Sequence, residues 1–291
     1  MPCAFISALM LIYALWPEPK TDLTPLPSPN GYDDFIKAGQ LLTSTSGDFT
    51  KMTTEELKSL ISTNQEPLRL VRLGLERECR VPTEDSMAYY QSHINDLPSV
   101  KRVAQLLSAE GRLAEVEERL DEAAKIHMEV MLLGQTSAHG GLVVDKLVGV
   151  AVENIGLVGL ERIAHRLNAP SCRKAISSLE EIDARADSAA VYIKRDRQWG
   201  RKATGTSDLS AWIQSALLTK SFFRNIYQKF TTKLLATERR RRLLLLNLAS
   251  RAYELEHGKR PSRAEELVPS VLRAIPKDPE TGTNLVLNPA L

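Results

Sequence analysis

The chain has 291 residues, of which 43% are hydrophobic and 25% charged, and this composition is typical of a globular protein with one large or two modest domains. Only 5% of the residues are aromatic, so the core must consist mainly of aliphatic side chains. The formal net charge of +2 provides no overall attraction to nucleic acid, and we expect no nucleic-acid partner.

The first segment, residues 1–16, is almost uninterruptedly apolar from Ala4 to Trp16. This run is shorter than the roughly 20 residues that a spanning helix needs. It also lacks the basic start and the small-residue cleavage pattern of a signal peptide. The pattern favours an uncleaved N-terminal anchor over a buried helix or a cleaved signal peptide. We therefore expect the chain to contact a membrane through residues 1–16.

The next segment, residues 17–31, is rich in proline, with five prolines between Pro17 and Pro29. It has too little apolar surface to pack, so it should form an extended linker. An anchor followed by such a spacer holds a folded body away from a membrane surface. The sequence thus predicts a protein of the cytoplasmic membrane with a single N-terminal anchor and an extracytoplasmic body.

Helical periodicity predicts that residues 32–235 form a multi-helix bundle, so the expected fold class is mainly α. Thr53 and Glu56 have the spacing of a capping box, which marks the start of one helix. Residues 98–133 repeat apolar side chains about every 3.6 positions, and Gly111 lies where a turn would divide them. We therefore expect an antiparallel helical hairpin in this segment.

Residues 140–167 are the most apolar segment of the body, and apolar side chains surround the predicted helix on nearly all sides. Such a helix belongs at the centre of a domain. Asp145, Gly149, Glu153 and Gly156 fall on one stripe of it. Glycines on that stripe allow a neighbouring helix to approach closely, and the two carboxylates need partners if they are buried.

Residues 236–291 are expected to form a small C-terminal module that consists of a helix and a short strand. The helix should end at Gly258, because glycine suits the left-handed position after a helix. A short second helix and a turn at residues 276–282 follow. The apolar residues 285–287 would then form a strand that lies back on the first helix.

One stretch of this module resembles a known family. The residues that carry the resemblance are, in order, Tyr253, Gly258, Pro261, Leu267, Val268, Pro276, Asp278, Pro279 and Gly282. Their order is similar to the segment after the N-terminal helix in the major pseudopilins of type II secretion. In those proteins the helix comes first, whereas here more than two hundred residues precede it. The resemblance therefore implies neither fibre assembly nor calcium binding.

The whole chain also resembles a group of bacterial proteins with an N-terminal membrane anchor and a helical middle. These proteins share the start Asn-Gly-Tyr-Asp-Asp, which is found here at residues 30–34. This second resemblance agrees with the predicted order of anchor, helical body and C-terminal module, but it implies no activity.

Side chains suited to acid–base or metal chemistry occur in and around the central helix. They are His139, Asp145, Glu153, Glu161 and His165. Glu161 and His165 lie one helical turn apart and could share a metal ion. The chain has no HExxH or Cys–His zinc spacing, no GxSxG, no P-loop and no GxGxxG after a strand. We therefore predict neither a metal nor a cofactor, and we keep the acidic and histidine cluster as an alternative.

Four consecutive arginines occupy residues 239–242. Such a run could bind phosphate or an acidic partner. Four consecutive residues, however, point around the whole circumference of a helix, so they produce no single basic face. We interpret the run as a solvated helix start with local ion pairs.

The oxidation state of the cysteines is a test of the predicted extracytoplasmic location. Cys3 belongs to the apolar first segment, which leaves Cys79 and Cys172 as a pair in the body. An oxidising compartment favours a disulfide between such a pair. A bridge would close a loop of more than ninety residues, worth about 4 kcal/mol in the chain-entropy model. Two separate buried thiols are the other possibility.

Two functions remain open at this stage. The first is a membrane-tethered extracytoplasmic structural or interaction protein with an envelope protein as partner, linked to secretion or envelope organisation. The second is a hydrolase-like or metal-dependent enzyme that uses the acidic and histidine cluster. The absence of a nucleophile–base motif from the sequence favours the first.

Overall fold

The computed structural model describes residues 25–43, 49–203 and 209–287, and side chains are described for all of these except residues 209–223. Within the described residues the chain is mainly helical, as predicted. The helices are α2 Gly31–Leu41, α3 Thr54–Thr63, α4 Gln65–Glu76, α5 Met87–Val116, α6 Leu120–Thr136, α7 Val143–Ile163, α8 Ala169–Arg185, α9 Ala189–Ala203 and α10 Leu209–His257, with single 3-10 turns η1 Ala164–Arg166 and η2 Ala264–Leu267.

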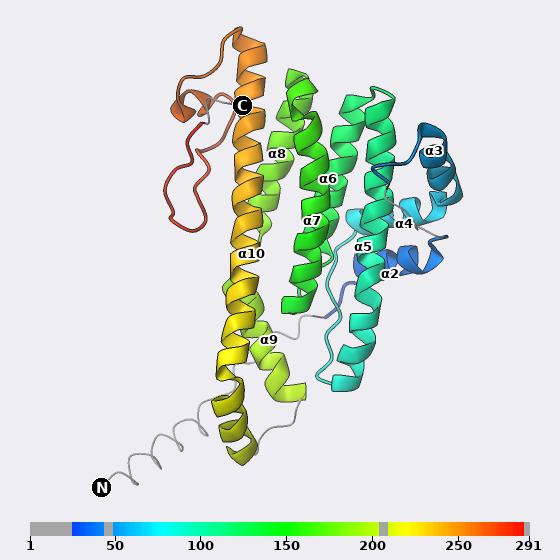
Figure 1. Ribbon diagram of the computed structural model, residues 1–291, viewed down its shortest axis with the longest axis vertical. Helices are drawn as coiled ribbons and strands as arrows, with labels where there is room; N and C mark the ends of the chain where they lie inside the picture. Colours follow the sequence, from blue (N-terminus) through cyan, green and yellow to red (C-terminus); the bar gives the residue numbers. More distant parts are fainter. Residues whose placement is uncertain (1–24, 44–48, 204–208, 288–291) are drawn as a thin grey trace.

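Five helices build the body of the molecule. Helices α5, α6, α7, α8 and α10 run side by side along its long axis (Figure 1). Helices α2, α3 and α4 cover one flank of this bundle and pack on α5 and α6. Helix α9 packs on α7 and α10 near one end. One large, mainly aliphatic core joins the bundle to α2, α3 and α4, and a second, smaller cluster with Tyr192, Tyr227 and Phe230 joins α9 to α7 and α10.

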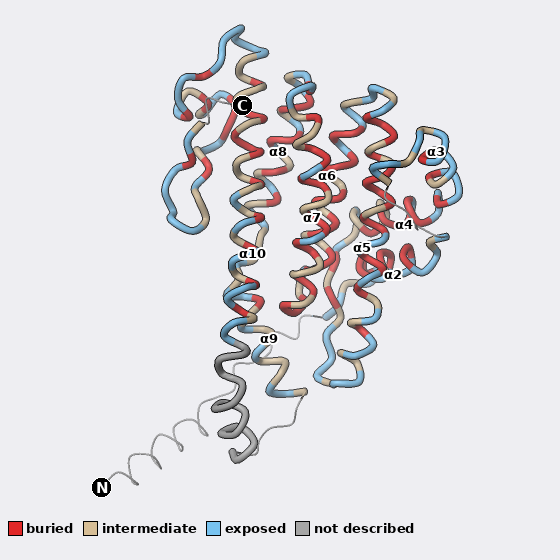
Figure 2. The backbone as a smooth tube through the Cα atoms, viewed as in Figure 1, coloured by how far each residue is buried: buried red, intermediate tan, exposed pale blue. Residues whose placement is uncertain are grey.

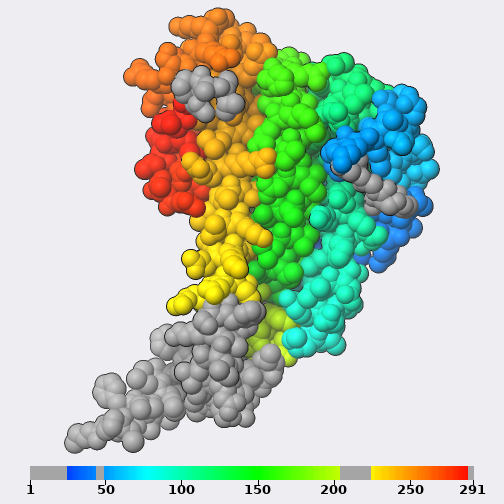
Figure 3. All heavy atoms as spheres, viewed as in Figure 1, coloured from blue at the N-terminus to red at the C-terminus, as the bar shows by residue number. Residues whose placement is uncertain are grey.

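Helix α7 lies at the centre, as its all-round apolarity predicted. It packs on α5, α6, α9 and α10, and it fills the space between α10 and α5 (Figure 3). Only Ala151 and Val158 of this helix are exposed, and most of its other residues are buried (Figure 2). The stripe glycines explain the tight fit, because a Cβ on Gly149 would lie 2.3 Å from the carbonyl oxygen of Gly134 on α6.

The predicted antiparallel hairpin is formed by α5 and α6, but its turn is not at Gly111. Helix α5 runs on to Val116, and the chain reverses at residues 117–119, where Glu118 has a φ of 58°. Gly111 is needed inside the helix because a Cβ there would lie 2.7 Å from the Cε1 atom of His127. The glycine therefore marks a close approach between two helices rather than a turn.

The boundary predicted between residues 235 and 236 falls inside α10. This helix has 49 residues and continues from Leu209 to His257. It packs on α8 and α7 of the body as well as on η2 of the C-terminal segment. It ends as predicted, with Gly258 at a φ of 71°. The body and the C-terminal segment thus share one continuous helix.

The C-terminal segment, residues 258–287, folds back along α10 (Figure 1). The predicted second helix is the single turn η2, and Leu267 on it is fully buried. The predicted turn is present: Gly282 has a φ of 72°, and its amide donates to the carbonyl of Asp278 at 2.8 Å. Within the described residues no strand forms, and pairing is limited to one β-bridge between Lys277 and Asn284.

The predicted anchor at residues 1–16, and the linker as far as residue 24, lie outside the described residues. Among the residues that are described, no helix has the length and apolarity needed to cross a membrane. The start of the body is fixed by Asn30, whose Oδ1 accepts hydrogen bonds from the amides of Tyr32 and Arg80 at 3.2 and 3.0 Å. Helix α2 is thereby held against the segment that joins α4 to α5.

Candidate functional site

The structure does not bring the five predicted site residues together. Asp145 pairs with His93, Glu153 with Arg241, and Glu161 with Arg240. His139 follows α6 and lines a groove, whereas His165 is exposed in η1. Among the described residues, no group of three or more histidine, cysteine, aspartate or glutamate side chains is placed to hold a metal ion.

The carboxylate of Glu153 belongs instead to a buried polar seam between α6, α7, α8 and α10. Arg241 is only 1% exposed, and it contacts both the fully buried Glu153 and Asp183 on α8. Its Nε donates to Asp183 Oδ1 at 2.6 Å. The opposite charges, particularly Glu153, raise the pKa of the Arg241 guanidinium even though burial opposes this shift. The prediction of a solvated arginine run is therefore wrong for Arg241.

The seam continues from Glu153 to a buried lysine. Gln135 on α6 donates from Nε2 to Glu153 Oε2 at 2.6 Å and accepts from Lys146 Nζ at 2.7 Å. The Lys146 ammonium also lies 5.7 Å from the centre of the Tyr192 ring. Burial lowers the pKa of Lys146, which the negative charge of Glu153 partly offsets. We shall call these side chains, Gln135, Lys146, Glu153, Asp183 and Arg241, the Arg241 seam.

A second buried network lies between α5, α6 and α7. Glu115, which is almost completely buried, accepts hydrogen bonds from His127 at 2.7 Å, Arg162 at 2.9 Å and Arg112 at 2.8 Å. Burial alone would raise the pKa of Glu115, but these three donors outweigh it and lower the pKa to about 2. The His127 ring is enclosed by Gly111 and Gly159, and its Nδ1 atom, like Nε of Arg162, is buried without a hydrogen-bond partner among the described residues.

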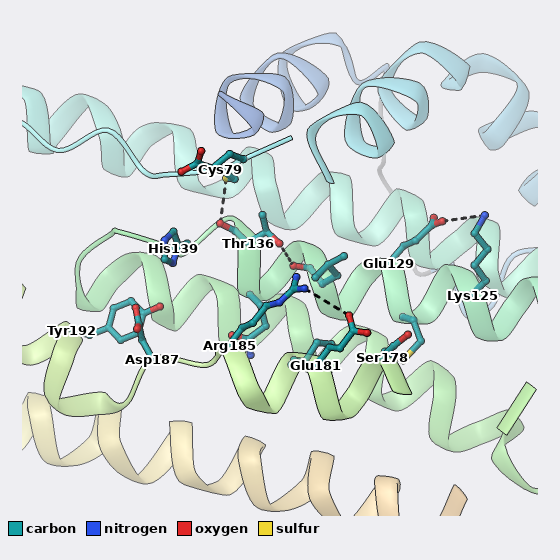
Figure 4. Close-up of a pocket in the computed structure, with 15 residues that line it drawn as sticks. Cys79, Lys125, Glu129, Thr136, His139, Ser178, Glu181, Arg185, Asp187 and Tyr192 are labelled. Atoms are coloured by element: carbon teal, nitrogen blue, oxygen red, sulfur yellow. Dashed lines mark hydrogen bonds and ion pairs between the residues drawn. The ribbon is translucent and has the colours of Figure 1, made fainter. Parts of the chain in front are cut away.

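A groove of about 690 Å³ lies between α6 and α8 and is closed at one end by α9. Its apolar wall consists of Met128, Leu132, Ile182 and Tyr192. Figure 4 shows His139, Asp187 and Tyr192 at one end of the groove and Lys125 and Glu129 at the other. Four carboxylates and two basic side chains line it: Glu78, Glu129, Glu181, Asp187, Lys125 and Arg185. Glu129 pairs with Arg72 and Lys125, Glu181 with Arg185 and Glu78 with Arg80, so the lining has more carboxylates than cations but most of them have an ion-pair partner.

A smaller cavity, of about 490 Å³, lies between α2 and α5. Its lining includes Tyr32 and Asp33 from α2 and Tyr89, His93 and Asp96 from α5. Behind His93, Asp145 accepts a 2.7 Å hydrogen bond from the amide of Leu142 at the start of α7, so its position is fixed. We shall call this the His93 cavity.

Both cysteines of the body are free and buried. The thiol of Cys79 donates to the carbonyl of Thr136 at 3.2 Å, and burial raises its pKa to about 12. Burial raises the pKa of Cys172, on α8, to about 11. The predicted disulfide is thus not formed in this structure, which shows the other possibility considered above, two separate thiols that pack as small apolar groups.

No family model matches the chain, and no curated protein and no solved structure is significantly similar to it. The candidate sites therefore rest on the geometry of this molecule. The resemblance of the C-terminal segment to pseudopilins remains a prediction.

Sequence reasoning missed three residues that organise these sites: Tyr32, His93 and Arg241. The Asp145–His93 pair joins side chains 52 positions apart, and no local pattern links them. For Arg241 a signal was present, because the carboxylates on α7 needed partners. A run of four arginines on one helix must turn one of them toward the core if the helix is packed there.

Proposed function

We propose that the protein is a membrane-tethered extracytoplasmic interaction protein that binds an envelope protein in the groove between α6 and α8. The observation that carries the proposal is the groove itself, which combines an apolar wall with a surplus of carboxylates. The helices that form it are held in place by the buried Arg241 seam. A preformed concave surface of this kind supports binding with little ordering cost.

The charge of the groove indicates the partner. A segment with apolar side chains and a surplus of lysine or arginine would cover the apolar wall and neutralise the carboxylates at the rim. An amphipathic helix supplies both on its surface, because side chains three and four positions apart share a face. The partner we propose is therefore an envelope protein with an exposed basic amphipathic helix.

Binding in the groove is tested with a helical peptide of leucine and lysine. A helical peptide of leucine and glutamate is the control with the opposite charge. We expect only the basic peptide to bind, as measured by fluorescence anisotropy. Glu181→Lys should weaken binding about two- to fivefold, because an exposed ion pair contributes up to about 1 kcal/mol. The control is Glu265→Lys, which makes the same charge change on the C-terminal segment. Equal losses in both variants would show a nonspecific charge effect and reject the groove.

The tether is tested separately in a bacterial host. An enzyme that is active only in the periplasm is fused after Pro29 of the full chain, and a second fusion carries an enzyme that is active only in the cytoplasm. We expect activity of the periplasmic enzyme and its recovery with membranes. Activity of the cytoplasmic enzyme alone would reject an extracytoplasmic body.

We also propose that the C-terminal segment contributes to partner binding in secretion or envelope assembly. Its resemblance to pseudopilins supports this proposal, as does Val286, which is 78% exposed next to the buried Leu285. That residues 285–287 form the strand predicted from the sequence is part of the same proposal. Val286→Asp should weaken partner binding without lowering the free energy of unfolding. An unchanged affinity would remove the segment from the interface.

A further inference from the structure

The His93 cavity has buried polar groups that the rest of the protein leaves without partners. Tyr32 is only 4% exposed, and its hydroxyl makes no hydrogen bond within the described residues. A buried hydroxyl without a partner costs about 1–3 kcal/mol, so folded proteins rarely retain one. This hydroxyl, however, has almost no accessible surface, so a ligand in the cavity would meet the ring of Tyr32 and not its hydroxyl.

The histidine offers a group that is open to the cavity. His93 is 5% exposed, and its Nε2 lies 2.6 Å from Asp145 Oδ1. With Nε2–H donating to this carboxylate, Nδ1 of the neutral ring keeps its lone pair and becomes an acceptor. The described part of the chain provides no hydrogen-bond donor to Nδ1. The pair thus presents an oriented acceptor at the wall of the cavity.

The charges around the cavity are negative. Asp33 and Asp96 line it, and neither forms an ion pair within the described ranges. Asp145 adds a third carboxylate behind His93, whereas Lys37 is the only basic side chain in the lining. The cavity therefore favours a cation that donates hydrogen bonds.

The aromatic rings distinguish an organic cation from a metal ion. His93 stacks between Tyr32 and Tyr89, with ring centres 6.0 and 5.8 Å apart. The Tyr89 hydroxyl is already engaged, donating to the carbonyl of Pro82 at 2.6 Å. Tyrosine faces attract ammonium groups and cover apolar carbon. A divalent metal ion would instead require a closer cluster of carboxylate and imidazole ligands.

We propose that the His93 cavity is a binding site for a small organic ammonium compound. The ammonium group donates to His93 Nδ1 and is neutralised by Asp33 and Asp96, while its carbon framework lies against the rings of Tyr32 and Tyr89. This site is distinct from the α6–α8 groove, so it can bind its ligand whether or not the groove binds a partner.

Benzylammonium is the probe, and benzyl alcohol and benzoate are matched neutral and anionic compounds. Binding to the full chain is measured by calorimetry and by chemical-shift changes of residues in α2 and α5. We expect benzylammonium to bind and the other two compounds not to bind. Equal affinity for benzyl alcohol would overturn the proposal, and so would displacement of benzylammonium by Mg²⁺ at constant ionic strength.

Two variants test the named contacts. Tyr89→Leu should weaken benzylammonium binding about threefold through loss of an aromatic face that attracts the ammonium group, whereas Tyr32→Phe should leave binding unchanged because its hydroxyl is closed off from the cavity. Asp96→Asn should weaken binding roughly threefold through loss of a partly exposed charge. The controls are Tyr90→Phe and Asp85→Asn, whose side chains lie outside the cavity. Unchanged affinity in both test variants would reject the site.

Discussion

The Arg241 seam and the His93 cavity both bury polar side chains between helices, and they differ in how those side chains are matched. In the seam, Arg241 contacts two carboxylates, and Gln135 links one of them to Lys146. In the cavity, the Tyr32 hydroxyl has no partner within the described residues, and Asp33 and Asp96 form no ion pair there. The charges of the seam are paired within the chain, although Arg241 Nη2 makes no hydrogen bond among the described residues, whereas the carboxylates of the cavity leave room for a ligand.

This difference shows where functional residues are found in a bundle rich in charges. A buried carboxylate attracts attention in a sequence, yet Glu153 and Glu115 are held by arginines and serve the packing of helices. Carboxylates that are paired in this way are occupied by their partners and are not available for chemistry. The groups that remain open are less conspicuous, since a tyrosine and a histidine on different helices carry no motif.

Replacement of Arg241 would break the seam. Arg241→Ala should lower the free energy of unfolding by about 3–5 kcal/mol, because it leaves a fully buried carboxylate without its charge partner. Chemical denaturation measures this effect. The matched control is Arg239→Ala in the same run: Arg239 is 56% exposed and pairs with Asp278, so the loss should stay below about 1 kcal/mol.

A double replacement sharpens this test. Arg241→Met combined with Glu153→Leu removes both charges and fills the space with apolar side chains, so it should recover much of the stability lost in the single variant. A double variant as unstable as Arg241→Ala alone would show that the two charges are not coupled, and the seam would lose its structural role.

The network around Glu115 predicts that the free energy of unfolding depends on pH. The pKa of Glu115 is lowered from 4.5 to about 2, so its carboxylate contributes about 3 kcal/mol to stability. This contribution is fully present above the unfolded pKa and is lost as the pH falls from about 4.5 to about 2. Unfolding free energies across this range should show the loss, and Glu115→Gln should flatten it. An equally steep loss of stability in Glu115→Gln would show that another group causes the pH dependence.

The close approach of α6 and α7 holds Gln135 against Glu153 and Lys146. A Cβ on Gly134 would lie 2.5 Å from the carbonyl oxygen of Gly149, and backbone cannot yield as a side chain can. Gly134→Ala should therefore destabilise the protein by about 1–3 kcal/mol. Gly200→Ala is the control, because no atom of the described residues lies within 4 Å of its Cβ position and alanine favours the helix. Equal melting temperatures for the two variants would contradict the model of a tight contact.

The two thiols give the smallest expected effect. Cys79 and Cys172 are buried and free, and their raised pKa values keep them protonated. Alkylation should fail on the folded protein and succeed for both in denaturant without a reductant, as read by peptide mass. A requirement for the reductant would instead reveal an oxidised pair and support the disulfide that the sequence suggested.

The parts of the fold that could be predicted depend on local patterns. The capping box of Thr53 and Glu56, the all-round apolarity of α7 and the stop at Gly258 each act within a few residues, and each is found in the structure. The turn predicted at Gly111 was wrong because a glycine serves tight turns and close helix contacts equally well. Only the position of His127 on the opposite helix decides between them.

The candidate sites could be predicted less well, because their members come from separate helices. Asp145 was found as a buried carboxylate, but its partner His93 lies on another helix. The five predicted residues share one region of the sequence, but in the structure Asp145 contacts α5, Glu153 contacts α6 and α10, and Glu161 contacts α10. Spacing along one helix therefore identified groups that need partners without showing which partners they have.

The four consecutive arginines of α10 have a consequence for how this helix is set in the molecule. Arg239 pairs with Asp278, Arg240 with Glu161, Arg241 with Glu153, and Arg242 with Asp183. Successive residues differ by about 100° in direction, so these contacts reach three different neighbours of the helix. Together these four ion pairs fix the rotation of α10 about its own axis. Aliphatic packing tolerates small rotations, but one inserted residue before the run would misalign all four pairs at once.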